Sequence, residues 1–168
     1  MNKKNNSNTK QFVVDFIKEK AVLYSDSEAT QSYSPSGELT TWILDFRRPF
    51  SHPDFLKALA ELFWQEFDKE RPWQIGGMES ASLPLVTAIA LAGKDVRTFY
   101  IRKSRKKSGL LLQVEGDLDP KRDIILVDDL MNSGSSFIKQ MKVLDSELGL
   151  KPKAIFSIVR FREFEQYR

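Results

Sequence analysis

The sequence predicts an α/β fold with a mainly parallel central sheet flanked by helices. Short apolar runs alternate along the chain with longer segments in which apolar residues recur at helical spacing, the order expected of strand–helix units. The run Ile124–Val127 is apolar at every position and rich in β-branched residues, which is typical of a strand buried on both faces of a parallel sheet. Strands connected through helices in this way favour a sheet covered on both faces.

The composition is that of an ordinary soluble protein with a single domain. The chain has 168 residues, of which 41% are hydrophobic and 29% charged, enough to bury a core. It has no Cys, which excludes a disulfide framework, a thiol nucleophile and a thiolate metal site, and which fits a reducing compartment. No apolar run approaches the ~20 residues that span a bilayer, and residues 1–10 lack the apolar segment of a secretory signal. We therefore expect a cytoplasmic protein without a membrane partner, and a disordered tail over residues 1–10.

The first elements are predicted from periodicity and turn residues. Residues 11–23 mix apolar and charged positions and predict a helix, whereas residues 24–41 are rich in turn formers and predict a loop or a short hairpin. The apolar residues of 42–46 predict a strand. Pro53 lies in the first turn of a strongly amphipathic helix. The only His, His52, is interpreted as part of this helix entry and not as a catalytic base.

The rest of the chain continues to alternate between strands and helices. The expected strands are Trp73–Ile75, Val96–Ile101, Ile124–Val127 and Ala154–Val159, and the expected helices are Leu83–Ala92 and the one that ends at Gly149. Gly76 and Gly77 are expected to end the first of these strands, and Arg160 to end the last. Residues 102–116 are expected to form a long basic loop.

The most informative stretch of the chain begins directly after Ile124–Val127. Asp128 and Asp129 are expected to stop this strand, and a polar turn at 132–136 leads into the helix that ends at Gly149. The turn therefore lies at the carboxyl end of a buried strand, where open α/β sheets bind their ligands.

The chemistry of this turn points to a phosphorylated sugar. Gly134 permits a close approach of the backbone, and the serine hydroxyls lie beside the free N–H groups of a helix N-terminus, where the helix dipole favours a phosphate. Asp128 and Asp129 would repel a bare phosphate, so they suit the hydroxyls of an attached sugar. The alternative is a plain strand end with an Asp turn and a Ser helix cap.

Two further stretches suggest anion binding. Residues 102–107 contain five basic residues in six, and such a cluster can bind nucleic acid, anionic lipid or a polyphosphate, or form a solvated loop. A nucleic-acid partner is disfavoured because no aromatic residues interleave within 102–116. The pair Gly76–Gly77 permits a backbone that exposes N–H groups to an anion, or alternatively a tight strand-to-helix turn.

The order of the turn resembles the phosphoribosyl-pyrophosphate (PRPP) loop of type I phosphoribosyltransferases. That loop has two acidic residues, two apolar residues and then a Thr/Ser-Gly-Thr/Ser turn; Asn132 stands where the family most often has Thr. The resemblance implies the type I phosphoribosyltransferase fold. It also implies that Asp128 and Asp129 hold the ribose hydroxyls. The implied 5′-phosphate contacts are Asn132, Ser133, Gly134, Ser135 and Ser136.

The basic loop narrows the resemblance to the orotate phosphoribosyltransferases. The order Arg-Lys-x-x-Lys…Glu-Gly is similar to their mobile catalytic loop, which implies that Arg102, Lys103 and Lys106 contact pyrophosphate and that Lys106 is the main catalytic lysine. Residues 107–108 depart from the family pattern, which has Asp and then an aromatic residue or His there. Residues 74–85 resemble the family's pyrophosphate-binding loop, which implies that Gly76, Gly77 and the backbone after them hold pyrophosphate. Ser80, Ala81 and Ser82 stand in place of further glycines or a Lys.

The same resemblance places the base at two other points of the chain. Arg160 stands where the orotate enzymes bind the orotate carboxylate and ring, and a planar guanidinium suits a carboxylate; a surface Arg at a strand end is the alternative. The segment from Ser36 to Trp42 resembles the one that lines the base site, with Pro35 in place of the family's Lys. Residues 11–50 would then form a small N-terminal hood that includes Trp42, and residues 51–168 the core of one domain.

The resemblance implies an enzyme most similar to orotate phosphoribosyltransferase. It would transfer 5-phosphoribosyl from PRPP to a pyrimidine base, orotate, as a homodimer with shared active sites. Mg²⁺ would be the cofactor, bound mainly through PRPP and not through a dedicated set of protein ligands. The sequence leaves two alternatives open, namely transfer to another base and a non-catalytic regulator on the same fold that senses PRPP or a nucleotide.

Overall fold

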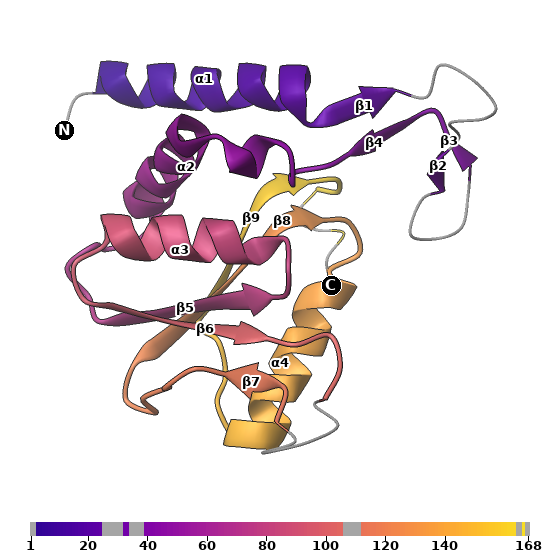
Figure 1. Ribbon diagram of the computed structural model, residues 1–168. Coiled ribbons are helices and arrows are strands. Elements are labelled where there is room, and N and C mark those ends of the chain that lie inside the picture. The colour runs from indigo at the N-terminus through magenta and orange to yellow at the C-terminus, as the bar shows by residue number, and fades with distance from the viewer. Residues whose placement is uncertain (1–2, 25–31, 34–38, 106–111, 164–165, 167–168) are drawn as a thin grey trace. The chain divides into compact units, whose positions relative to one another are not determined.

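The computed structural model describes residues 3–24, 32–33, 39–105, 112–163 and 166 (Figure 1). The chain divides into two compact units, Met1–Ala58 and Leu59–Arg168. The boundary between them lies inside helix α2 (Pro53–Glu66). Within the described ranges, no helix combines the length and the apolar composition that crossing a bilayer requires.

The first unit combines helices with short antiparallel strands. Strand β1 pairs with β4, and β2 pairs with β3, so the short hairpin expected within 24–41 is present. Its core contains clustered phenylalanines, including Phe16 stacked on Phe55 with ring centroids 4.9 Å apart. The elements are α1 (Lys3–Lys20), β1 (Val22–Tyr24), β2 (Ser32–Tyr33), β3 (Leu39–Thr40), β4 (Trp42–Leu44), the 3₁₀ turn η2 (Pro49–Ser51) and the start of α2.

Helix α1 differs from its predicted extent. It begins at Lys3, whereas the sequence-based prediction starts it at residue 11 and leaves residues 1–10 as a disordered tail. The polar segment 3–10 contains no Gly or Pro, and a helix that is already nucleated gains one hydrogen bond for each residue that it adds. The helix also ends earlier than predicted, at Lys20, because Val22–Tyr24 pairs as a strand with Trp42–Leu44.

The second unit is the predicted α/β sheet. Five strands lie in the order β7-β6-β5-β8-β9, and all neighbouring pairs are parallel except β6 with β7. The strand β7 was not predicted, since its residues belong to the expected basic loop. The elements are β5 (Trp73–Met78), α3 (Ser82–Ala92), β6 (Val96–Ile101), β7 (Val114–Glu115), β8 (Asp123–Met131), α4 (Ser135–Leu148) and β9 (Ala154–Arg160) (Figure 1).

Strand β8 is buried on both faces, as predicted. Residues 124–127 are all buried, and because side chains alternate along a strand, Ile124 and Leu126 share one face while the other two share the opposite one. The first face packs in a core cluster with Phe137 and Leu144 of α4. The connection β5–α3–β6 runs in the opposite direction across the sheet from β8–α4–β9, so right-handed crossovers place α3 and α4 on opposite faces.

Two predicted strand ends are wrong. Asp128 and Asp129 do not stop β8, because its neighbour β9 continues beside it, pairing Ser157 with Asp128 and Arg160 with Met131. Gly76 and Gly77 do not end β5 either. They lie within the strand, which pairs with β6 as far as Met78.

The glycines of β5 are required by close packing. A Cβ atom on Gly76 would lie 2.5 Å from the ring of Phe99, and one on Gly77 would lie 2.4 Å from the carbonyl oxygen of Val127. Both distances are far shorter than any side chain tolerates. The pair therefore permits the aromatic ring of β6 and the backbone of β8 to approach this strand.

Candidate functional site

The candidate site lies at the carboxyl ends of two neighbouring strands, β5 and β8, whose helical connections lead to opposite sides of the sheet. Strands β5 and β8 are neighbours, but the strand after β5 lies on one side of this pair and the strand after β8 on the other. Open α/β sheets bind their ligands at such a switch point, outside the carboxyl ends of the strands. Here these ends are Met78 of β5 and the segment after Val127 of β8.

The acidic pair lies at this point. The side chain of Asp128 is buried, with 9% of the residue exposed, and Asp129 is half-buried. The hydroxyl of Ser136 donates a 2.8 Å hydrogen bond to Oδ2 of Asp128, and the backbone N–H of Asp129 donates a 3.0 Å bond to Oδ1. The carboxylate of Asp129 accepts a 2.9 Å bond from the N–H of Leu130.

Burial perturbs the titration of Asp128. Loss of water around the carboxylate, aided by the neighbouring charge of Asp129, raises the pKa of Asp128 from 3.8 to about 6, against the opposing effect of the hydrogen bond from Ser136. The group is therefore ionised at neutral pH and lies close to its protonation range. A buried carboxylate of this kind is a strong acceptor for a hydroxyl donor.

The polar turn leads into the N-terminus of α4. Gly134 has φ of 78°, in the left-handed region that glycine adopts without strain, and the helix begins at Ser135. The hydroxyl of Ser133 donates a 3.0 Å bond to that of Ser135. Asn132, Ser133 and Ser135 are exposed. The strand–turn–helix thus brings together the acidic pair and the serine turn, as the sequence predicts.

A buried glutamine supports this arrangement from behind. Gln140 is fully buried on α4, and its Nε2 donates a 3.2 Å bond to the hydroxyl of Ser136. Its Oε1 has no hydrogen-bond partner among the described residues. The sequence-based prediction missed Gln140, although a polar residue on the apolar stripe of Phe137 and Leu144 is a signal that could have found it.

The start of the basic loop is tied to the loop after β5. Lys103 donates its backbone N–H to Oε1 of Glu79 over 2.8 Å, and Glu79 donates its own N–H to the carbonyl of Ile101. The guanidinium of Arg102 lies 3.9 Å from the carboxylate of Glu115. Arg102 and Lys103 thus leave the carboxyl end of β6 at the same edge of the sheet as Asp128. Lys106 lies outside the described residues, as do residues 107–111.

The loop after β5 is closed by a serine. Ser82 is fully buried, and its hydroxyl donates a 2.6 Å bond to the carbonyl of Met78. Ser80 is exposed, and the peptide bond that joins Glu79 to Ser80 is cis. Ser82, one of the departures from the family pattern, therefore has a structural role.

The two predicted base contacts lie in different units. Arg160 ends β9 opposite Met131, so it belongs to the same carboxyl edge of the sheet as the acidic pair. Trp42 begins β4 in the first unit and is 43% exposed. Pro35 and residues 36–38, the first part of the motif that resembles a base-site lining, lie outside the described residues.

No set of three or more His, Cys, Asp or Glu side chains in the described part of the chain could hold a metal ion. The carboxylates of Asp128 and Asp129 are nevertheless hard oxygen donors at the carboxyl edge of the sheet, the ligand type that Mg²⁺ prefers.

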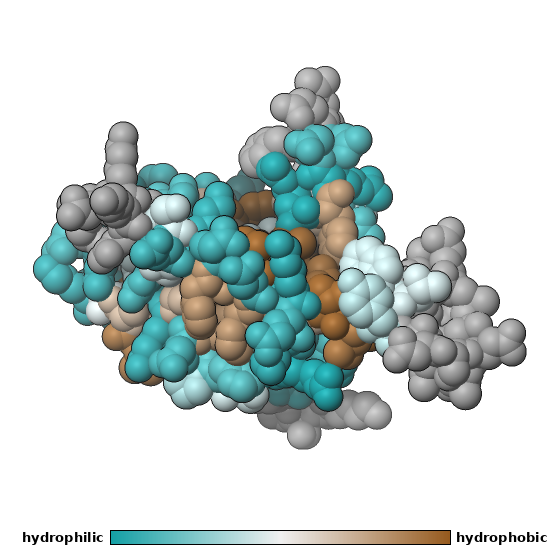
Figure 2. Space-filling view, turned by 90° about the horizontal axis from the view of Figure 1, so that it is seen from above, coloured by the Kyte–Doolittle hydropathy of each residue, from teal (hydrophilic) through white to brown (hydrophobic). Residues whose placement is uncertain are grey.

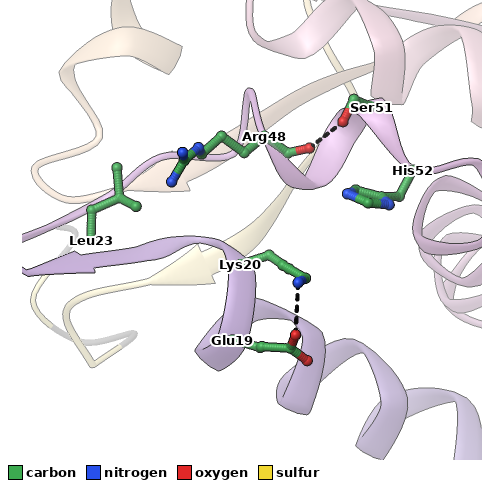
Figure 3. Close-up of a pocket in the computed structure, with 6 residues that line it drawn as sticks. All are labelled: Glu19, Lys20, Leu23, Arg48, Ser51 and His52. Carbon is green, nitrogen blue, oxygen red and sulfur yellow. Dashed lines mark hydrogen bonds and ion pairs between the residues drawn. The ribbon is translucent and has the colours of Figure 1, made fainter.

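The first unit has a hollow of its own, of about 480 Å³ (Figure 3). Lys20 on its wall pairs with Glu19 at 2.7 Å, and the hydroxyl of Ser51 donates to the carbonyl of Arg48. His52 packs edge-on against Phe16, as its place at the helix entry predicts. We assign no ligand to this hollow.

Hydrophilic side chains cover most of the face of the molecule in Figure 2, with smaller hydrophobic areas between them.

Comparison with known proteins identifies relatives by sequence. No protein-family model matches the sequence. The orotate phosphoribosyltransferase of Aquifex aeolicus is 31% identical over 132 residues, 74% of this chain and 69% of the relative. That of Methanosphaera stadtmanae is 28% identical over 125 residues, 74% of this chain and 70% of the relative.

A solved structure extends the similarity to the fold. The orotate phosphoribosyltransferase from Aeropyrum pernix superposes with a TM-score of 0.70 at 25% identity, and the match covers 92% of this chain and 82% of that one. The sequence relatives named above and this solved structure are all orotate phosphoribosyltransferases. The chain has the type I phosphoribosyltransferase fold and belongs to the orotate phosphoribosyltransferase family.

Proposed function

We propose that the chain is a pentosyltransferase that transfers 5-phosphoribosyl from PRPP to orotate and releases pyrophosphate. The observation that carries the proposal is the junction of a buried carboxylate and a serine-rich helix N-terminus at the switch point of the sheet, where Ser136 donates to Asp128. This junction offers acceptors for sugar hydroxyls and donors for a phosphate within one strand–turn–helix. Membership of the orotate phosphoribosyltransferase family supports the choice of reaction.

The ribose 5-phosphate half of PRPP binds at the end of β8. Asp128 and Asp129 accept hydrogen bonds from the ribose hydroxyls. Residues 132–136, with the first N–H groups of α4, hold the 5′-phosphate, because the free donors and the positive end of the helix dipole favour a dianion there.

The pyrophosphate half binds between the loops after β5 and β6. Arg102, Lys103 and Lys106 supply positive charge, and backbone N–H groups of residues 79–81 supply neutral donors. Gly76 and Gly77 act indirectly in this proposal, since both lie inside β5 and let Ser82 and Phe99 pack closely. Positive charge that is held in place where the leaving group develops negative charge lowers the barrier.

The reaction is a substitution at C1 of the ribose. The bond between C1 and the pyrophosphate oxygen breaks, the ring oxygen shares the developing positive charge, and a ring nitrogen of orotate forms the new bond from the opposite face. The electron pair of the broken bond leaves with pyrophosphate, and the proton of the attacking nitrogen is released to water. The carboxylate of Asp129 stabilises the positive charge on the ring, and no protein nucleophile takes part.

Orotate binds near the carboxyl end of β9. The planar guanidinium of Arg160 suits the carboxylate of the base. The assignment of Trp42 and of the hood over residues 11–50 to the base rests on the sequence resemblance alone. The enzyme works in the cytoplasm as a homodimer whose basic loops contribute to the partner's site.

Mg²⁺ fits this site as a companion of PRPP. The cation favours oxygen ligands and keeps several waters, so the acidic pair and a diphosphate together offer suitable donors. When bound, it would neutralise negative charge on the pyrophosphate. Asp128 and Asp129 orient the sugar through its hydroxyls.

The test is release of pyrophosphate from PRPP in the presence of a panel of purine and pyrimidine bases, with Mg²⁺ throughout. We expect turnover with orotate and a nucleoside monophosphate as the second product. Turnover with another base alone would replace orotate in the proposal. A protein that binds PRPP but releases no pyrophosphate with any base would contradict the enzymatic function.

A further inference from the structure

A buried carboxylate near the C-terminus of α4 binds the backbone at the end of the basic loop, where the chain enters β7. The side chain of Glu147 is only 4% exposed. Its Oε2 accepts a 2.9 Å bond from the N–H of Gln113 and a 3.2 Å bond from that of Val114, and the guanidinium of Arg105 lies 3.5 Å from its Oε1. An acid in the last turn of a helix opposes the helix dipole, and its burial is costly without partners. The contacts with Gln113, Val114 and Arg105 offset the cost of burying this charge.

Gln113, which Glu147 holds, is in turn hydrogen-bonded to Arg102. Its carbonyl accepts a 2.8 Å bond from the N–H of Arg102, and its side-chain Nε2 donates a 3.1 Å bond to the carbonyl of Arg102. The neighbouring residues Val114 and Ile101 pair in the β6–β7 ladder. Both backbone groups of Arg102 are therefore fixed by one residue, whose own N–H is held by Glu147.

We propose that Glu147 is a positioning residue for phosphoribosyl transfer, which acts through Gln113 to fix the backbone from which Arg102 reaches the pyrophosphate. The inference rests on the proposed function, because it assumes that Arg102 contacts that group. Glu147 touches neither substrate nor the reacting atoms. Its effect is to hold a cationic side chain in the geometry that the leaving group requires.

Glu147 lies far from the residues proposed to bind ribose 5-phosphate. Glu147 and Ser136 lie at opposite ends of α4, and eleven residues of helix correspond to about 17 Å along its axis. A change at Glu147 is thus expected to affect the pyrophosphate half of the site and to leave the acidic pair and the serine turn intact. A general loss of structure would affect both halves.

The experiment compares two ligands on Glu147→Gln. The substitution removes the charge and turns an amide N–H₂ group toward donors. Calorimetric titration with PRPP is expected to show affinity reduced about tenfold, within the range for losing a hydrogen bond to a charged group. Titration with ribose 5-phosphate is expected to give the wild-type affinity. Asp145→Asn, an exposed acid on the same turn with the same charge change, is the control and should leave both affinities unchanged.

Equal affinity of Glu147→Gln and wild type for PRPP would overturn the inference, and so would an equal loss for PRPP and ribose 5-phosphate. Should Glu147→Gln fail to fold, Gln113→Ala removes only the side-chain bond to the carbonyl of Arg102 and is expected to weaken PRPP binding selectively; an unchanged affinity would then overturn it. A wild-type protein that neither binds PRPP nor releases pyrophosphate would instead contradict the proposed function itself.

Discussion

The hydroxyl of Ser136 donates a 2.8 Å hydrogen bond to the carboxylate of Asp128, which joins β8 to the first turn of α4. The contact links the acid proposed to hold the sugar to the turn proposed to hold its phosphate. Gln140 in turn donates to the same hydroxyl from the buried side of the helix. The relative position of the two halves of the ribose 5-phosphate site therefore depends on this contact.

Removing the hydroxyl should weaken the site and the fold together. Ser136→Ala leaves a buried carboxylate without one donor, so we expect a loss of about 1–3 kcal/mol in the free energy of unfolding. Affinity for ribose 5-phosphate should also fall, as measured by calorimetric titration. Ser146→Ala, which removes an exposed hydroxyl bonded to the carbonyl of Val143, is the matched control. Equal stability of the two variants would contradict the role of the contact.

The ionised carboxylate of Asp128 should lower the free energy of unfolding at neutral pH. Burial raises its pKa from 3.8 to about 6, so the folded protein holds this proton more tightly than the unfolded chain. Its contribution favours folding at pH below 3.8 and is lost as the pH rises through about 6. We therefore expect the stability of Asp128→Asn relative to wild type to be higher at pH 8 than at pH 4.5, by up to about 3 kcal/mol.

Denaturant titrations of wild type and Asp128→Asn between pH 4.5 and 8 measure this difference, where the range brackets the shifted pKa. The same variant should bind PRPP more weakly at pH 8, because the amide is a poorer acceptor than a carboxylate. A gain in stability that does not change with pH would show that the carboxylate is not the source of the effect.

Much of the site could be predicted because its signals are local. The acidic pair, Gly134 and the serines lie within one strand–turn–helix, and each residue type has a direct reason to be there. The glycine after α4 is likewise confirmed, with φ of 66° at Gly149. The strand ends could not be predicted in this way, since the continuation of β8 beyond Asp128 depends on pairing with β9, which is distant in the sequence.

The supporting residues were missed because their partners are remote. Glu79, Gln140 and Glu147 are ordinary polar residues until the fold brings Lys103, Ser136 and Gln113 to them. Gln140 and Glu147 nevertheless fall on the apolar stripe of α4 that includes Leu144, and that mismatch is visible in the sequence. Polar residues on a buried stripe are therefore a useful place to search for groups that support a site.

The glycines of β5 should prove essential for folding. A methyl group on Gly77 would lie 2.4 Å from the carbonyl oxygen of Val127, a backbone atom that cannot move aside. We expect Gly77→Ala to reduce the free energy of unfolding by about 1–3 kcal/mol or more, as overpacking does. Gly149→Ala, where nothing lies within 4 Å but φ is 66°, should cost less, about 1 kcal/mol. Thermal unfolding of both variants measures the order, and the reverse order would contradict the packing argument.

Lys106 should be required for turnover. Its proposed role is to neutralise the departing pyrophosphate, so Lys106→Ala is expected to lower kcat by roughly 10²-fold, as the loss of one transition-state donor does. Lys142→Ala, an exposed lysine on α4, is the control and should retain wild-type kcat. Steady-state rates of pyrophosphate release at saturating PRPP and orotate measure the effect. A kcat for Lys106→Ala equal to that of the control would exclude the role.

The most direct test of the central claim is calorimetric titration of PRPP into wild type and Asp129→Asn. The claim is that the acidic end of β8 binds the sugar of PRPP while the serine turn binds its phosphate. We predict that wild type binds PRPP and that Asp129→Asn, shown by thermal unfolding to be folded, binds it about tenfold more weakly or worse. Equal affinity of the two proteins for PRPP would contradict the claim.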